Sequence, residues 1–258
     1  MREATRVLRR ERHGSSSPVV VSCADGAWFT KLRGAAQGVA PLVAELVVGA
    51  LADACGVAVP ARTLITIPAG IASDDVNDEL RDLLDASVGV NVGFALLEAA
   101  RNLTPAEYER VPLEVAAAVL WLDVLVQNLD RSPANPNIMV RRGVYWAIDH
   151  GAALPYQHDW RAVREDSAQR PYDVAGHLFA WAAPVLPDVH VQLAPRLTRD
   201  GLAAAVAVVP DEFLAGDGVD VARRRAMYVT MLWKRLRWMG EQFGGAREVG
   251  GVVGRNVE

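Results

Sequence analysis

The sequence predicts a mixed α/β protein of the α+β kind, with a small strand-rich N-terminal part that contains one helix and a larger, mainly helical C-terminal part. Two observations support this prediction. Extended runs rich in β-branched and aromatic residues lie on both sides of a single apolar helix in the first 68 residues. After residue 78, apolar residues recur mostly at helical spacing. With 258 residues, 51% of them apolar, the chain can bury a substantial core.

The first part of the chain predicts three antiparallel strands. The extended runs are Thr5–Arg9, Pro18–Cys23 and the sequence AWFTKL at residues 27–32. A polar GSSS sequence separates the first two runs, and an Asp-Gly pair before the third is typical of a hairpin turn. Lys31 therefore lies near the end of the third strand.

A helix and a further extended region complete the strand-rich part, which is expected to span residues 1–72. Helical spacing predicts a helix over residues 40–55, with Gly56 as its C-cap. Glu45 lies one turn into this helix among apolar neighbours. Because a buried acid requires a partner, Lys31 is the expected one. Residues 57–68 predict either a strand pair or one bent strand.

The C-terminal part is expected to span residues 73–243 and to be mostly helical. A polar connector at 72–79 leads into it, and segments 96–102 and 105–110 flank a turn. Gly-rich sequence without periodicity follows, so residues 244–258 are expected to form a disordered tail. The predicted helices cover residues 78–86, 113–128, 174–183, 198–208 and 219–243.

Composition excludes several classes of function. The net charge of -4 gives no general electrostatic reason to bind nucleic acid or an anionic membrane. No apolar run reaches the roughly 20 residues that span a bilayer, and the basic N-terminus lacks the apolar stretch of a secretory signal. A cytoplasmic location is therefore expected. The chain has neither a Walker A sequence nor a nucleophile elbow, and its two cysteines form no close-spaced pair.

Lysine is rare in this chain. Among 27 basic residues, Lys31 and Lys234 are the two lysines and the rest are arginine. A compact ammonium on a flexible stem differs in shape and hydration from a planar guanidinium, so a remaining lysine marks a position where that difference matters. Lys31 is thus a candidate functional residue, although a solvent-exposed strand end is the alternative interpretation.

Two acids lie at the ends of one loop and hairpin. Asp130 follows the apolar helix, in a loop whose two prolines cannot continue that helix. Ile138–Val140 and Val144–Ile148 then predict a tight hairpin, and Asp149 follows its second strand. The hairpin should return Asp149 to the loop that contains Asp130.

Two carboxamides, Asn135 and Asn137, lie in the same loop. Together with Asp149 they predict an oxygen-donor site for a hard cation such as Mg²⁺, which keeps waters or phosphate oxygens in its other positions. Each of these residues is by itself also a common turn former.

These segments resemble the HipA-like kinases, which have a two-lobed protein-kinase-like fold and are distantly related to phosphatidylinositol kinases. The resemblance runs from about Gly14 to Trp238, and the last two of its five segments are the most specific. The segments are GSSSP, DGAWFTKLRGAAQG, LVAELVVGALA, QNLDRSPANPNIMV and WAIDHGAAL.

The resemblance implies roles for individual residues. Lys31 would hold the α- and β-phosphates of ATP and pair with Glu45, and Asp130 would accept the proton of the acceptor hydroxyl. Asn135 and Asp149 would hold Mg²⁺, and Asn135 is preferred to Asn137 because it lies at the family's spacing of five residues after the catalytic acid. Such a site suits phosphoryl transfer, which depends on positioning and charge neutralisation.

The sequence departs from the kinase pattern in two places. It has no GxGxxG sequence, so Gly14, Ser15, Ser16 and Ser17 would have to cover the phosphates with N–H groups and hydroxyls. His150 stands where protein kinases have phenylalanine.

The expected function is ATP- and Mg²⁺-dependent transfer of the γ-phosphate to a hydroxyl, most simply that of Ser or Thr in a protein. One alternative is a nucleotide-binding pseudokinase that regulates a partner. A second keeps the fold but is a small-molecule phosphotransferase or a nucleotidyl transferase, and a third is a helical interaction protein. The sequence does not identify the acceptor, any protein partner or the oligomeric state.

Overall fold

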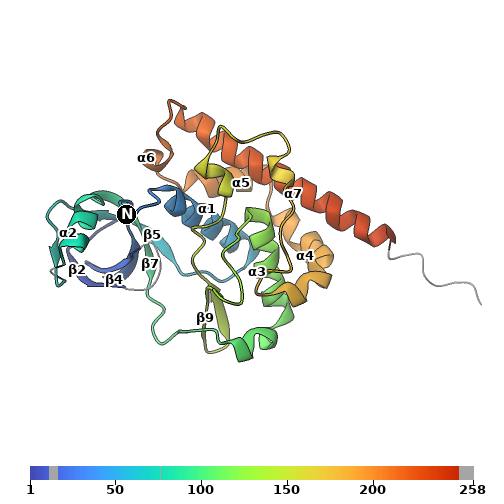
Figure 1. Ribbon diagram of the computed structural model, residues 1–258, viewed down its shortest axis with the longest axis horizontal. Helices are drawn as coiled ribbons and strands as arrows, with labels where there is room; N and C mark the ends of the chain where they lie inside the picture. The colour runs from blue at the N-terminus through green and yellow to red at the C-terminus, as the bar shows by residue number, and fades with distance from the viewer. Residues whose placement is uncertain (12–16, 76, 250–258) are drawn as a thin grey trace, which may run out of the picture.

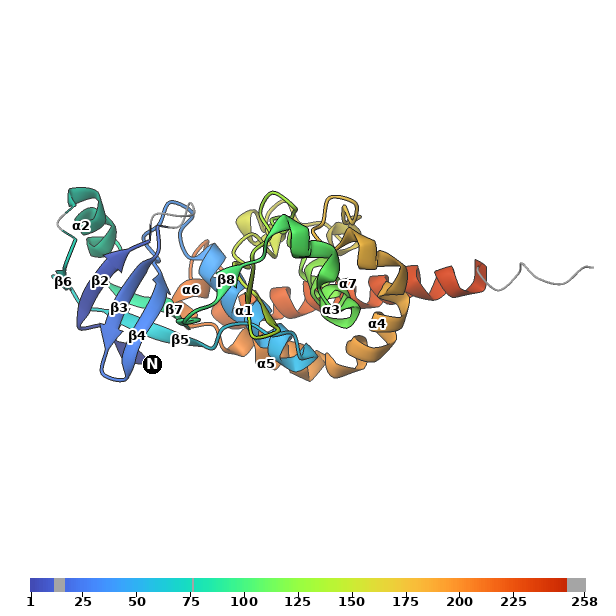
Figure 2. The same cartoon turned by 90° about the horizontal axis from the view of Figure 1, so that it is seen from below.

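A computed structural model of the protein describes residues 1–11, 17–75 and 77–249. Strands gather at one end of the molecule and helices at the other, and both views in Figures 1 and 2 show this division. The predicted mixed α/β class, with a strand-rich part and a helical part, is therefore confirmed. Across the described ranges, no helix is both long enough and apolar enough to span a membrane.

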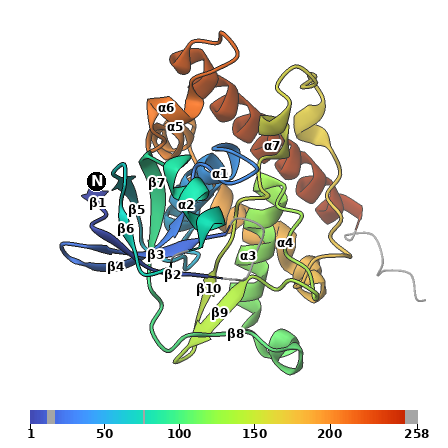
Figure 3. The same cartoon turned by 60° about the vertical axis from the view of Figure 1, so that its left-hand side comes forward.

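A curled sheet of seven strands forms the strand-rich part, in the order β1-β5-β7-β4-β3-β2-β6. The predicted antiparallel pairing of the first three runs is confirmed by the β2-β3-β4 meander. A separate sheet of three strands, β10-β9-β8, lies below α3 in Figure 3. The strands are β1 (Arg2–Glu3), β2 (Arg6–Arg10), β3 (Val19–Cys23), β4 (Gly26–Lys31), β5 (Arg62–Ile67), β6 (Ala72–Ser73), β7 (Gly89–Ala95), β8 (Arg101–Asn102), β9 (Ile138–Arg141) and β10 (Val144–Ala147).

The helices fill the rest of the molecule. Figures 1 and 2 agree that α1 lies between the large sheet and α3. The predicted C-cap of α1 is confirmed, since Gly56 has a φ of +76° and its N–H bonds back to the last turn. The helices are α1 (Ala40–Cys55), α2 (Asp78–Asp85), α3 (Leu113–Val126), α4 (Leu186–Leu193), α5 (Arg199–Ala207), α6 (Asp211–Leu214) and α7 (Val221–Val249), with short 3₁₀ turns η1 (Pro105–Arg110), η2 (Pro155–His158), η3 (Ser167–Gln169), η4 (Ala180–Val185) and η5 (Ala194–Arg196).

The sheet extends further along the chain than the sequence pattern predicted. β7 pairs antiparallel with both β4 and β5, and it lies beyond residue 72, where the strand-rich part was expected to end. In its sequence, GVNVGFA, apolar residues alternate with small or polar ones as in a strand, but two glycines weaken this signal, and pairing with two distant strands stabilises the segment. The division into domains at residue 72 stays a prediction.

Two helical predictions at the C-terminal end were inaccurate. Instead of a helix over 174–183, residues 174–179 form turns, η4 begins at Ala180 and α4 follows from Leu186. Pro184 lies inside η4, and Pro187 lies in the first turn of α4, where a missing N–H is tolerated. α7 continues to Val249, beyond the predicted start of the tail at Gly244. Phe243 extends the packing of this helix by contacting His190, with ring centroids 5.4 Å apart. Residues 250–258 lie outside the described part of the chain.

Two apolar clusters stabilise the molecule. The larger one joins α1 to the helices and includes the fully buried Trp121 of α3. The smaller one lies between the large sheet and α2, which covers the sheet in Figure 3, and includes Ile65, Ile67 and Leu80. Because α1 packs with the helical cluster while β4 belongs to the sheet, residues at the end of β4 and on α1 meet where the two parts join.

Candidate active site

Lys31 lies at that junction, at the end of β4. Its side chain is buried, with 7% exposed, and it forms ion pairs with Glu45 of α1 and with Asp149, whose Oδ1 lies 2.7 Å from the ammonium. Burial alone would favour the neutral amine, but the charges of the two acids outweigh it and raise the pKa of Lys31. The ammonium therefore stays charged, and the interpretation of Lys31 as a solvent-exposed strand end is wrong.

Glu45 links three segments of the chain. It is 1% exposed on α1, binds Lys31, and accepts a hydrogen bond of 3.0 Å from the backbone N–H of His150. The partner expected for this buried acid is thus present. Through Glu45, the position of α1 is tied both to the end of β4 and to the segment that follows β10.

Asp149 follows β10 and adopts a left-handed backbone conformation, with a φ of +56°. Its side chain is 44% exposed, in contrast with Glu45. Although burial opposes it, the charge of Lys31 lowers the pKa of Asp149, so this acid is a carboxylate at neutral pH.

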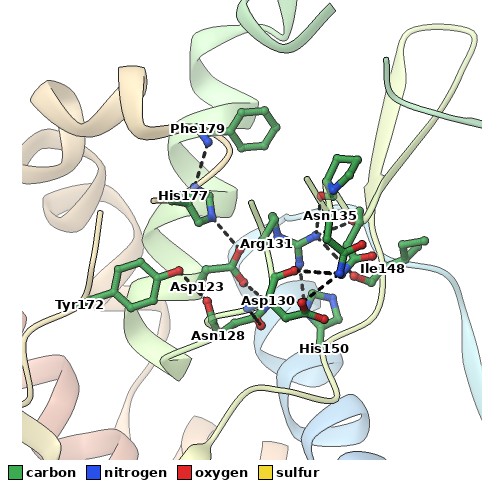
Figure 4. Close-up of polar contacts among 12 residues, drawn as sticks. Asp123, Asn128, Asp130, Arg131, Asn135, Ile148, His150, Tyr172, His177 and Phe179 are labelled. Carbon is green, nitrogen blue, oxygen red and sulfur yellow. Dashed lines mark hydrogen bonds and ion pairs between the residues drawn. The ribbon is translucent and has the colours of Figure 1, made fainter. Parts of the chain in front are cut away.

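The loop that contains Asp130 is closed by hydrogen bonds of its own. Backbone groups of Ser132 and Asn135 bond to each other at 3.0 and 3.1 Å. The side-chain N–H of Asn135 donates to Oδ1 of Asp130 at 2.9 Å, and that of Asn137 donates to the backbone oxygen of Asp130 at 3.1 Å. Both asparagines thus hold the acid in place, as Figure 4 shows for Asn135.

The hairpin returns the chain to this loop, as the sequence predicted. β9 and β10 pair in a register that places Ala147 opposite Ile138. The pairing continues one residue further, since Ile148 N–H donates to the backbone oxygen of Asn137 at 3.0 Å. The backbone of Asn137 is therefore paired with Ile148, the residue that precedes Asp149, whereas Asn135 lies two residues earlier in the loop.

Two cavities meet at Lys31 and Asp149, which line both of them. The larger has a volume of about 510 Å³, which suits a ligand of nucleotide size. The smaller, about 110 Å³, is also lined by Asp130 and by Gln37 and Gly38 of the loop after β4. The apolar lining of the larger cavity comes from both parts of the molecule: Phe29, Val59, Phe94, Leu96, Met139 and Ile148.

A buried polar network of Arg131, Asp123 and His177 contacts the loop that contains Asp130, and sequence reasoning assigned this network no role. Arg131 and Asp123 form an ion pair of 2.5 Å with side-chain exposures of 0% and 1%, and His177 lies 3.0 Å from the same carboxylate oxygen (Figure 4). The charge of Arg131 and the hydrogen bond from His177 outweigh burial and hold the pKa of Asp123 well below its usual range. The rule that identified Glu45, a lone acid in an apolar helix, applies equally to Asp123 on α3.

His150 belongs to the same network. Its Nδ1 lies 3.4 Å from Nη2 of Arg131, and because a guanidinium only donates, the ring proton lies on Nε2. Burial, together with the charge of Arg131, lowers the pKa of His150 and keeps the ring neutral. Within the described ranges, Nε2 has no hydrogen-bond partner.

The site matches the needs of Mg²⁺ in its donor chemistry. Asp149 offers a half-exposed carboxylate, and Asn135 and Asn137 offer carboxamides in the adjoining loop. Oxygen donors in small number suit Mg²⁺, which keeps several waters and binds substrate phosphates. No group of three or more His, Cys, Asp or Glu side chains suited to a metal occurs among residues 1–11, 17–75 and 77–249.

The predicted phosphate-covering sequence falls mostly outside the described residues. Gly14, Ser15 and Ser16 belong to the segment 12–16, of which nothing is described. Ser17 is described, and its hydroxyl accepts a hydrogen bond of 3.1 Å from Arg10. The role of these four residues stays a prediction.

Comparisons with known proteins agree with this geometry. A family model described as HipA-like kinase matches residues 4–217. Among solved structures, 14 chains match, and one of them is a proinflammatory kinase of Helicobacter pylori, CtkA, which shares 11% sequence identity. The match covers 93% of this chain and 95% of that one with a TM-score of 0.55, which shows a kinase fold. No curated protein matches the sequence.

Proposed function

Since this chain belongs to the HipA-like kinase family, we propose that it is an ATP- and Mg²⁺-dependent kinase that transfers the γ-phosphate to a Ser or Thr hydroxyl of a protein. The observation that carries this proposal is the convergence of Lys31, Glu45 and Asp149, of which Lys31 and Asp149 line both cavities and Glu45 lines the larger one. Asp130 lines the second of them.

The larger cavity is the proposed site of the nucleotide. Its apolar walls, which include Phe29, Phe94 and Met139, suit a flat base, and Lys31 lines the same cavity. A charged ammonium there suits the α- and β-phosphates, and Glu45 would hold the lysine stem in place while phosphates replace Asp149 as its second partner.

Asp149 and one of the two asparagines would hold Mg²⁺, which supplies neutralisation of phosphate charge when it is bound. The hairpin register favours Asn137, because its backbone pairs directly with the residue before Asp149. The spacing of five residues from Asp130 favours Asn135. Both therefore stay candidates for this role.

Asp130 is the proposed acceptor of the hydroxyl proton. It is exposed, it lines the small cavity together with Asp149, and Asn135 orients one of its carboxylate oxygens. A carboxylate held in this way removes the proton as the hydroxyl attacks. Lys31, which lines the same cavity, supplies positive charge where negative charge accumulates.

The dimensions beside Asp130 favour a side-chain hydroxyl as the acceptor. The cavity there measures about 110 Å³, and Gln37 and Gly38 also line it. Such a space receives one serine or threonine side chain more readily than a polycyclic antibiotic. The presence of Lys31, Asp130 and Asp149 together also disfavours a regulatory pseudokinase.

The test is transfer of radiolabelled γ-phosphate from Mg²⁺-ATP by the wild type and by Asp130→Asn. The substitution removes the proton acceptor but keeps the size of the side chain, so turnover should fall by about 10²-fold to 10⁴-fold while ATP binding persists. Mass spectrometry of the products locates the label on Ser or Thr. Equal labelling by both proteins would rule out transfer by this site.

A further inference from the structure

Arg131 follows Asp130 directly in the chain, but the two side chains have opposite environments. Asp130 is exposed, whereas the side chain of Arg131 is fully enclosed, with 0% exposed. Moving a guanidinium out of water costs several kcal/mol unless ion pairs and hydrogen bonds replace the lost hydration. The partners of Arg131 therefore indicate what this buried charge stabilises.

The end of the guanidinium faces two separate stretches of the chain. Nη1 donates to the backbone oxygen of Asn137 at 2.5 Å and lies 3.4 Å from those of Pro136 and Ile148. Nη2 lies 3.4 Å from Nδ1 of His150. One side chain thus contacts both the segment that follows β10 and the end of the loop at residues 130–137, the proposed catalytic loop, as Figure 4 shows.

Asp123 holds the other side of the guanidinium in a fixed orientation. Nε of Arg131 donates to Oδ2 of Asp123 at 2.5 Å, and Asn128 donates to Oδ1 at 3.0 Å. Nδ1 of His177 accepts the N–H of Phe179, so its Nε2 carries the proton and donates to Oδ2 of Asp123. Both oxygens of the Asp123 carboxylate therefore accept hydrogen bonds, and Asp123 itself lies on α3.

We infer that Arg131 is a positioning residue, which sets the separation between the asparagine end of the catalytic loop and Asp149. Nη1 contacts the backbone oxygens of Asn137, which is a proposed Mg²⁺ donor, and of Ile148, the residue before Asp149, so a shift of the guanidinium moves both donor groups. Lysine does not replace it, because one ammonium lacks the planar fork that reaches several acceptors in different directions. The catalytic consequence rests on the proposed function, whereas the structural consequence does not.

Arg131→Lys tests the inference, because it keeps the positive charge opposite Asp123. Calorimetric titration with ATP, once in EDTA and once in Mg²⁺, separates nucleotide binding from metal binding. We expect the affinity in EDTA to stay unchanged and the gain on adding Mg²⁺ to be lost. The Mg²⁺ concentration for half-maximal transfer should rise about tenfold to a hundredfold, the usual effect of removing a group that orients metal ligands.

Arg235→Lys is the matched control. Arg235 is also buried, with 2% exposed, and it also donates to backbone oxygens, those of Val124, Ala168 and Arg170. None of these is near Asn137 or Asp149 in the chain. This variant should lose stability without losing the effect of Mg²⁺ on ATP affinity.

Amide hydrogen exchange measures the structural part without any ligand. Arg131→Lys should speed exchange in peptides that cover residues 136–140 and 147–151, and Arg235→Lys should not. Equal exchange in the two variants, or an unchanged gain from Mg²⁺ in Arg131→Lys, would overturn the inference. If wild-type protein binds ATP equally with and without Mg²⁺, the proposed function fails, and the exchange experiment still decides the role of Arg131.

Discussion

Two buried cations, Lys31 and Arg131, contact adjacent residues just after β10, and they differ in what surrounds them. Lys31 contacts Glu45 and Asp149 and lines two cavities. Arg131 contacts Asp123 and several backbone oxygens and has no exposed side-chain surface. Lys31 borders cavities in which a ligand could replace one of its carboxylate partners, whereas Arg131 is enclosed and its partners are groups of the protein.

The residue types suit these two situations. An ammonium is a compact charge on a flexible stem that can move from Asp149 toward a phosphate, while a guanidinium bonds in several fixed directions at once. In a chain with only two lysines, the one at this site is the cation whose partners are expected to change. Both side chains are buried, so burial alone does not distinguish a charge that could bind a ligand from one that stabilises the fold. Access to a cavity, which Lys31 has, does distinguish them.

The largest expected effect is on stability and comes from breaking the buried ion pair between Arg131 and Asp123. Asp123→Asn leaves Arg131 buried without a counter-charge, which should lower the free energy of unfolding by about 3–5 kcal/mol. Urea denaturation measures this change. The control is Asp25→Asn, which removes the acid of the half-exposed pair with Arg2 and should cost less than about 1 kcal/mol. Similar losses in both variants would show that the enclosed pair is no more than a surface pair.

Removing the ammonium of Lys31 should affect turnover more than folding. Lys31→Met deletes the ammonium beside the cavities, so kcat/KM for ATP should fall by about 10²-fold to 10³-fold, the usual effect of losing a preorganised electrostatic contact. Steady-state transfer assays measure this, and circular dichroism checks the fold. Lys234→Met alters the other lysine, which is exposed on α7, and should leave kcat/KM unchanged. A loss shared by both variants would contradict the assigned role.

The smallest expected effect is the pH dependence of stability. Asp123 has a lowered pKa in the folded protein, so its stabilising contribution is complete above its unfolded value of 3.8 and is lost as the pH falls toward the folded value. The pKa of Asp149 is lowered too, but its half-exposed side chain contributes less. The difference in unfolding free energy between wild type and Asp123→Asn should be constant near neutral pH and shrink below about pH 4. A difference that grows in acid would have the wrong sign.

Much of the candidate site could be predicted because its signals are local. The scarcity of lysine singled out Lys31, and the apolar neighbours of Glu45 predicted its burial and its partner. The spacing of Asp130 and Asp149 around a hairpin predicted that they would line one pocket, which they do. Each of these signals depends on residue type within a short window.

Other features depended on contacts between distant segments. β7 was missed because two glycines weaken its short alternating pattern, and pairing with β4 and β5 stabilises the strand. The roles of Arg131 and His177 were missed because their shared partner, Asp123, lies on another element. Nothing in the local sequence around Arg131 distinguishes a buried arginine that forms several hydrogen bonds from a solvated one.

The sequence by itself determined the mixed α/β class, the kinase resemblance and the four side chains around which the proposed chemistry is built. Only the tertiary structure decided which cation is enclosed, which cavity each acid lines and which asparagine lies beside the residue before Asp149. The physical reason is that residue type and spacing set local preferences, whereas burial, ion pairing and cavity access arise only when segments far apart in the chain pack together.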